Sequence, residues 1–168
     1  NLKDKIELQS NLFQKLQDQG QEKIKSNHDK INELLSESDN YAVTNEELEV
    51  KVTDLLGDQE KVAGADKKLR KLNNFKGQIS NKVAMITKEH KFFTENTVCP
   101  TCTQSIEESF RLNKIDDVQT KARELKKGFN DLEESIKTEQ DRECQFKKLT
   151  KEIAKLNHDI SQNNTHIS

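Results

Sequence analysis

The stretch TENTVCPTCTQS, from Thr94 to Ser105, decides the fold of this chain. It is rich in residues that favour turns, and it contains Pro100, the only proline among 168 residues. Helices tend to end before the residue that precedes a proline, because the proline ring disfavours the helical conformation there. We therefore predict that this stretch is a turn between two helical arms.

Both sequences that flank the predicted turn carry apolar residues in a seven-residue repeat. The first series runs from Ile6 to Val83 with three interruptions, and the second runs from Val118 to Ile167 with one interruption, at Glu139. A looser companion series follows each of them at a spacing of three or four residues. A repeat sustained over so many turns is typical of helices that wind around each other in a left-handed coiled coil.

Two such arms around one short break predict an all-α fold, an antiparallel coiled-coil hairpin with an apical turn. We expect an ascending arm at 1–93, a hook at 94–105 and a descending arm at 106–168. The polar stretch 36–44 is a candidate break in the ascending arm, and 57–66, which holds two glycines, is a weaker one. Mirroring about the turn pairs residue i with roughly residue 201 − i, because both arms rise equally per residue.

Composition excludes several classes of protein. Only 31% of the residues are hydrophobic and 5% aromatic, which is too little apolar material for an ordinary globular core of this length. The formal net charge of −2 argues against a surface that coats nucleic acid. The chain begins with Asn1 and carries no signal-peptide pattern, so we expect it to be an internal part of a longer protein. Three cysteines without a disulfide framework favour a reducing compartment, and we expect a cytoplasmic location.

The hook contains a C-x-x-C motif formed by Cys99 and Cys102. A structural zinc site needs four ligands, and thiolates are common among them. Cys144 lies too far along a continuous helix to join the motif, and His90 is expected to point away from it. The two missing thiolates would then come from a second copy, so that one Zn²⁺ is shared between the tips of two chains.

Four neighbours of the cysteines complete the predicted hook turn and dimer contact: Val98, Pro100, Thr101 and Ile106. Pro100 stiffens the turn and removes one backbone N–H group beside the metal site. Val98 and Ile106 are apolar and flank the cysteines, so they are candidates for contact with the partner tip. Packing within the hairpin explains them equally well.

Two other interpretations of the cysteine pair remain open. The chain is then either a plain coiled-coil spacer with an incidental pair of cysteines, or a dithiol redox element. The redox interpretation requires a βαβ setting, and no strand pattern is present. The sequence contains no P-loop and no G-x-G-x-x-G pattern, and it pairs no nucleophile with a nearby histidine. We expect no catalytic residue and no nucleotide-binding or other cofactor-binding residue in this chain, apart from the zinc ligands.

The combination of a long heptad arm, Cys99-Pro100-Thr101-Cys102, an apolar Ile106 four positions later and a returning heptad arm resembles a known family. It is similar to the zinc-hook region of SMC-like DNA double-strand-break repair ATPases of the SbcC/Rad-fifty class, which includes the large subunit of a phage recombination endonuclease. The specific part of the resemblance covers about a dozen residues, because heptad repeats are generic. Thr103 stands where many members of the family carry glycine.

The resemblance implies a structural role for this chain, without enzymatic activity of its own. The parent protein would be an ATPase that binds DNA and a nuclease subunit through regions outside these residues. The hook would join two arms through Zn²⁺, in the service of DNA repair and recombination.

Overall fold

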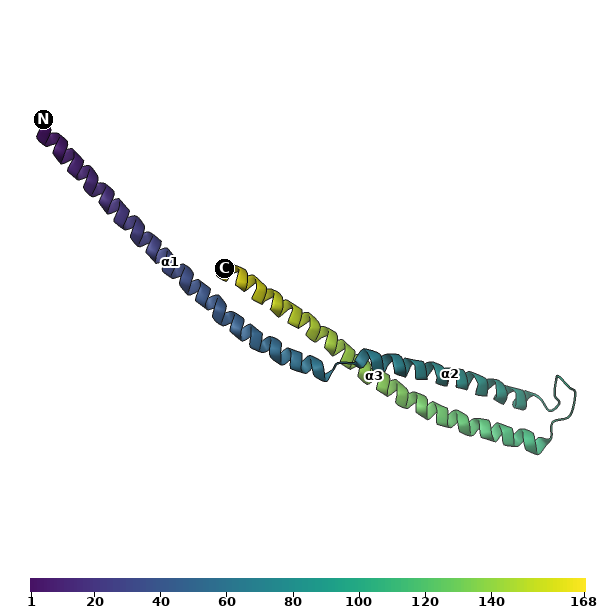
Figure 1. Cartoon of the computed structure of the whole chain (residues 1–168). Coiled ribbons are helices and arrows are strands. Elements are labelled where there is room, and N and C mark those ends of the chain that lie inside the picture. Colours follow the sequence, from purple (N-terminus) through teal and green to yellow (C-terminus); the bar gives the residue numbers. More distant parts are fainter. The chain divides into compact units, whose positions relative to one another are not determined.

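The computed structural model of the chain describes residues 1–168 and consists of three α-helices. Helix α1 spans Leu2–Lys61, α2 spans Ala65–Glu95 and α3 spans Glu108–Ile167 (Figure 1). The only β-type pairing is an isolated bridge between Val98 and Ser105. The prediction of an all-α fold is therefore confirmed.

Contacts between Cα atoms divide the chain into two units. The first unit comprises residues 1–56 and 152–168, and the second comprises residues 57–151. In each unit, residues that precede the turn between α2 and α3 contact residues that follow it. We describe each unit by itself.

The second unit is a helical hairpin in which α2 lies beside the first part of α3 (Figure 1). Residue numbers rise on one side of the contact as they fall on the other. The contacting pairs are Gln59 with Thr150, Lys68 with Glu139, Lys76 with Glu133, and Phe93 with Phe110. This reversed order means that the two sides run in opposite directions.

The first unit shows the same reversed order. The ring of Tyr41 stacks on that of His166, with centroids 5.0 Å apart and an interplanar angle of 11°. The Nδ2 atom of Asn45 donates to Oδ1 of Asn164 at 2.8 Å, and Nδ2 of Asn163 donates to Oδ1 of Asn45 at 2.8 Å. Asn45 is the only buried polar residue of the chain.

The predicted register was wrong by about two helical turns in these contacts. Mirroring about residue 100 would place Tyr41 opposite residue 160, whereas its ring meets His166. Part of the shift arises because the turn is centred later, as the bridge between Val98 and Ser105 shows. Side-chain direction contributes to the shift as well. Helical side chains lean toward the N-terminus of their own helix, so in antiparallel helices both contacting partners carry higher numbers than backbone mirroring gives.

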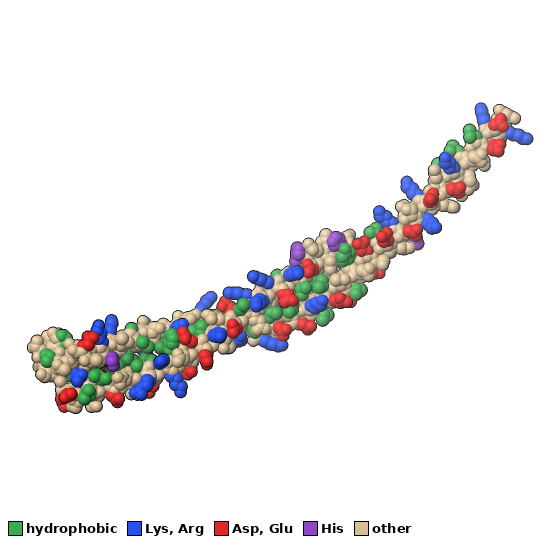
Figure 2. Space-filling view, turned by 180° about the vertical axis from the view of Figure 1, so that it is seen from behind, with side chains coloured by type: hydrophobic (Ala, Val, Ile, Leu, Met, Phe, Trp, Pro, Cys, Tyr) green, Lys and Arg blue, Asp and Glu red, His purple; other side chains and the backbone are tan.

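The buried apolar side chains of the chain belong to the two seven-residue series and their companion series. They are Ala65, Leu69, Val118, Ile136 and Ile153, each no more than 9% exposed. On the second unit, hydrophobic side chains gather along the line between the helices, and basic and acidic side chains intermingle outside it (Figure 2). All five buried apolar residues therefore belong to the repeats, although other members of the repeats, such as Ile6 and Phe13, remain exposed.

The predicted break at 36–44 is absent, because α1 continues through these residues to Lys61. The Oγ1 atom of Thr44, at the end of this stretch, donates to the Asn40 carbonyl within the helix. Contacts of Tyr41 and Asn45 with α3 stabilise the helical conformation there, and the three residues between them remain exposed. Tertiary packing thus overrides weak local helix propensity.

The break lies instead in the weaker candidate stretch, at residues 62–64. Gly64 has a φ of 81°, in the left-handed region that glycine adopts without a steric penalty. It is the N-cap residue of α2, and its carbonyl accepts a hydrogen bond from Lys68 N at 3.2 Å. The turn at 62–64 separates α1 from α2.

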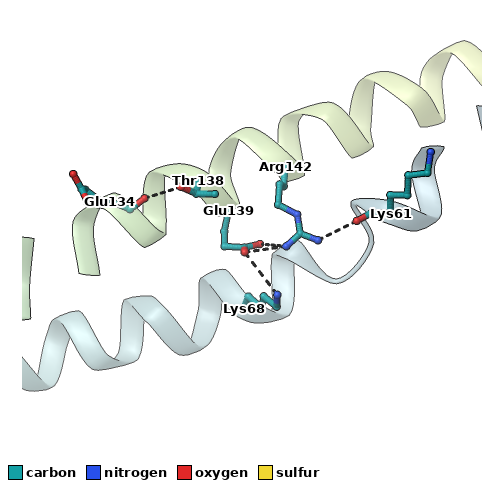
Figure 3. Close-up of polar contacts among 6 residues, drawn as sticks. All are labelled: Lys61, Lys68, Glu134, Thr138, Glu139 and Arg142. Atoms are coloured by element: carbon teal, nitrogen blue, oxygen red, sulfur yellow. Dashed lines mark hydrogen bonds and ion pairs between the residues drawn. The ribbon is translucent and has the colours of Figure 1, made fainter. Parts of the chain in front are cut away.

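A polar cluster on α3 faces this break (Figure 3). The Nη1 atom of Arg142 donates to both carboxylate oxygens of Glu139 at 2.9 Å, and its Nη2 atom donates to the Lys61 carbonyl at 3.2 Å. The Nζ atom of Lys68 lies 3.8 Å from Oε1 of Glu139. Glu139 is the one polar member of the second heptad series. This polar interruption of the series therefore lies opposite the break between α1 and α2.

Candidate functional site

Residues 96–107 connect α2 to α3 and contain the C-x-x-C motif. The helix α2 ends at Glu95, and both the backbone N and the Nδ2 atom of Asn96 donate to the Phe92 carbonyl, at 3.1 and 2.9 Å. At the other end, Arg111 N donates to the Glu107 carbonyl at 2.9 Å. The predicted hook, 94–105, therefore overlaps this connection with an offset of two residues.

Backbone hydrogen bonds hold the connection in a narrow loop. The N–H group of Ile106 donates to the Thr97 carbonyl at 2.9 Å, and that of Cys99 donates to the Gln104 carbonyl at 2.8 Å. The N–H group of Thr103 donates back to the Cys99 carbonyl at 2.8 Å and closes a tight turn. Both cysteines therefore lie on one turn at the end of the second unit.

Polar groups of the turn surround the sulfur of Cys99. The backbone N–H groups of Cys102 and Thr101 donate hydrogen bonds to it, and the side chains of these two residues add smaller contributions. These hydrogen bonds hold the pKa of the Cys99 thiol below its usual range, because they stabilise the thiolate. The thiolate is the form that binds metals and acts as a nucleophile.

Thr103 follows the second cysteine with an unusual backbone conformation. Its φ of 60° lies in the left-handed region, and it is the only residue other than glycine with a positive φ. A β-branched residue is disfavoured there by steric contact between its side chain and its own backbone. Its Oγ1 atom donates to the Cys102 carbonyl at 2.7 Å. The turn imposes a conformation that glycine would adopt at lower cost.

The predicted site residues differ in exposure. Cys102, Pro100 and Thr101 are exposed, whereas Cys99 and Ile106 are half-buried. Val98 is 47% exposed. The connection thus presents Cys102 and its two preceding residues to solvent.

Cys99 and Cys102 supply two thiol groups, which is the donor chemistry that zinc prefers. Nowhere in the chain do three or more His, Cys, Asp or Glu side chains gather where they could hold a metal ion. Cys144 lies on α3, outside the connection. A tetrahedral zinc site built on the two thiolates would therefore need two ligands from another molecule.

Sequence patterns did not single out the contacts at the base of the connection. Phe93 near the end of α2 and Phe110 at the start of α3 meet edge to face, with centroids 6.0 Å apart. The Nη1 atom of Arg111 donates to the Phe93 carbonyl at 3.1 Å. An arginine in a charged helical sequence carries no signal of this role, because the contact joins residues 18 positions apart.

No family model, curated protein or solved structure matches this chain. Charged side chains recur along all three helices, and none of these helices combines the length and hydrophobicity that crossing a membrane requires.

Proposed function

We propose that this chain is a zinc-mediated dimerisation module at the tip of an antiparallel coiled-coil arm. Cys99 and Cys102 of each copy act as ligands, and one Zn²⁺ is shared between two chains. The observation that carries the proposal is the presence of both cysteines on one exposed turn at the end of a helical hairpin. The hydrogen bonds that favour the Cys99 thiolate support it further.

Each chain carries half of a metal site, so metal binding and the association of two chains are coupled. Each chain supplies two of the four ligands of a tetrahedral zinc ion, so neither chain completes the coordination alone. Zinc then stabilises the pair of tips by linking their thiolates. Val98, Pro100, Thr101 and Ile106 form the contact around the ion, and the half-exposed side chain of Val98 offers apolar surface to the partner.

The resemblance of this hook to the zinc-hook family extends the proposal to the parent protein. We place the chain in an SMC-like ATPase for DNA double-strand-break repair and recombination, located in the cytoplasm. This protein works with a nuclease subunit and binds DNA outside the residues described. In that setting the chain is a connecting and tethering element and carries no catalysis itself.

The proposal is tested by the mass of the chain in solution with Zn²⁺, measured by analytical ultracentrifugation. Replacing both Cys99 and Cys102 by serine is expected to abolish the zinc-dependent dimer. Replacing Cys144 by serine is the matched control and is expected to leave the dimer intact, because Cys144 lies on α3 outside the connection. If the double variant dimerises like the unaltered chain, the cysteine pair is incidental and the chain is a spacer.

A further inference from the structure

Arg111 occupies an unfavourable place in its own helix. It lies in the first turn of α3, which begins at Glu108. The N-terminus of a helix carries partial positive charge, so a cation in this turn is disfavoured by the helix dipole. A partner outside α3 would therefore stabilise the charge of Arg111.

The C-terminus of α2 supplies that partner. The last four backbone carbonyls of a helix accept no hydrogen bond from within the helix. In α2, which ends at Glu95, these are the carbonyls from Phe92 onward. Asn96 donates two hydrogen bonds to the Phe92 carbonyl. The Phe93 carbonyl instead accepts from Nη1 of Arg111 at 3.1 Å, in a part-buried contact. A cation at this end of α2 is favourable, because the helix dipole is negative there.

The contact lies where the connection leaves the two helices. Phe93 provides the carbonyl and its ring also meets Phe110, the residue before Arg111. Phe92 lies edge to face against Phe93, with centroids 5.1 Å apart. Arg111 and these rings together fix the distance between the last turn of α2 and the first turn of α3.

We infer that Arg111 is a positioning residue of the metal half-site. By tying the Phe93 carbonyl to α3, it sets the separation of the two ends of the connection and so preserves the hydrogen bonds that shape the cysteine turn. This role rests on the proposed function, because a preformed turn matters for thiolates that must meet a second copy around one ion. Preorganisation of this kind improves affinity by reducing the ordering that binding requires.

The test compares Arg111→Met and Arg111→Lys with Arg123→Met in two measurements. Arg123 is the matched control, because it is exposed on the same helix and its side chain bonds only to Gln119 within that helix. The first measurement is amide hydrogen exchange of the metal-free chain. Arg111→Met is expected to speed exchange at Cys99, Thr103 and Ile106 and to leave the interiors of α2 and α3 unchanged.

The second measurement is titration with Co²⁺, followed by the absorption of thiolate-bound cobalt. Arg111→Met is expected to raise the midpoint Co²⁺ concentration about tenfold, because the cysteine turn of each chain is then less ordered before it binds the metal. Arg111→Lys should lie between this variant and the unaltered chain, and Arg123→Met should match the unaltered chain. A role limited to helix stability would lower the melting temperature of Arg111→Met without changing amide exchange in the cysteine turn or the midpoint Co²⁺ concentration.

Two results would overturn the inference. One is unchanged exchange in the connection of Arg111→Met, and the other is an equal effect of the Arg111 and Arg123 substitutions. Failure of the unaltered chain to bind Co²⁺ would count against the proposed function instead. In that case the exchange measurement still decides whether Arg111 positions the cysteine turn.

Discussion

Cys99 differs from an ordinary exposed cysteine in the donors that surround its sulfur. The backbone N–H groups of Cys102 and Thr101 stabilise its thiolate and hold its pKa below the usual range. Because the pKa is lowered in the folded chain, the hydrogen bonds favour folding above the ordinary thiol pKa. This contribution is lost as the pH falls through the lowered pKa.

Alkylation of Cys99 by iodoacetamide should therefore begin at lower pH in the folded chain than in the chain unfolded by urea. The thiolate is the reactive form, so the pH at half-maximal rate reports the pKa of the thiol. Mass spectrometry of the peptide that contains Cys99 provides the rate. Identical pH profiles in the folded and unfolded chains would show that the N–H donors do not stabilise the thiolate.

Residue types at the turn were easier to predict than their conformations. The turn around Pro100 followed from the sequence, because few residue types end a helix. Thr103 does not carry such a signal, since threonine is rarely found at positive φ. The role of Arg111 was missed for a related reason, because only the folded chain brings it to the Phe93 carbonyl.

At the scale of the helices, two glycines in the same stretch have opposite roles. Gly64 holds a φ of 81° between α1 and α2, whereas Gly57 lies within α1. Gly64→Ala should lower the free energy of unfolding by about 1 kcal/mol, because alanine is strained in the left-handed region. Gly57→Ala should raise it by about 0.5–1 kcal/mol, because alanine favours a helix interior. Neither new methyl group meets another atom within 4 Å.

Thermal unfolding followed by circular dichroism, with a chelator present, measures both changes. The two variants are expected to shift the midpoint in opposite directions. Equal stabilisation by both substitutions would mean that α1 and α2 form one continuous helix through residues 62–64.

Asn45 is the polar residue that sets the register of the first unit. Its two hydrogen bonds to Asn163 and Asn164 are made only in one alignment of the helices. A buried asparagine in a helical interface typically specifies register at some cost in stability. Asn45→Leu should therefore allow a second alignment, shifted by one heptad.

Disulfide trapping measures this register, in a chain whose three native cysteines are replaced by serine. Cysteines at Tyr41 and His166 report the observed alignment, and cysteines at Tyr41 and Asp159 report the alignment shifted by seven residues. With Asn45 present, only the first pair should cross-link well. If the shifted pair forms no more disulfide in Asn45→Leu than with Asn45, apolar packing alone fixes the register.

The sequence predicted the helices better than the places where they break. Positions such as Leu69 and Val118 are buried as the seven-residue repeat indicates, because burial follows the spacing of apolar residues. The polar stretch 36–44 was misjudged, since its contacts with α3 cannot be seen in a local sequence. Asn45 lies seven residues before Val52, a member of the companion series. Because Asn45 is polar, a search for apolar repeats did not include it.

For the whole molecule, the core is small. Five apolar residues are buried among 168, so burial of apolar surface within one chain offers limited stabilisation. Several apolar side chains of α1 remain exposed, including Ile6 at 60% and Phe13 at 69%. We propose that metal-linked contact between two tips adds to this stabilisation.

The central claim is tested most directly by zinc content and mass measured together on the purified chain. We predict one Zn²⁺ for every two chains and a mass twice that of the 19.4 kDa monomer. Removing the metal with a chelator should return the mass to that of the monomer, because each half-site is incomplete alone. One Zn²⁺ bound to each single chain, or a dimer that persists without metal, would contradict the account.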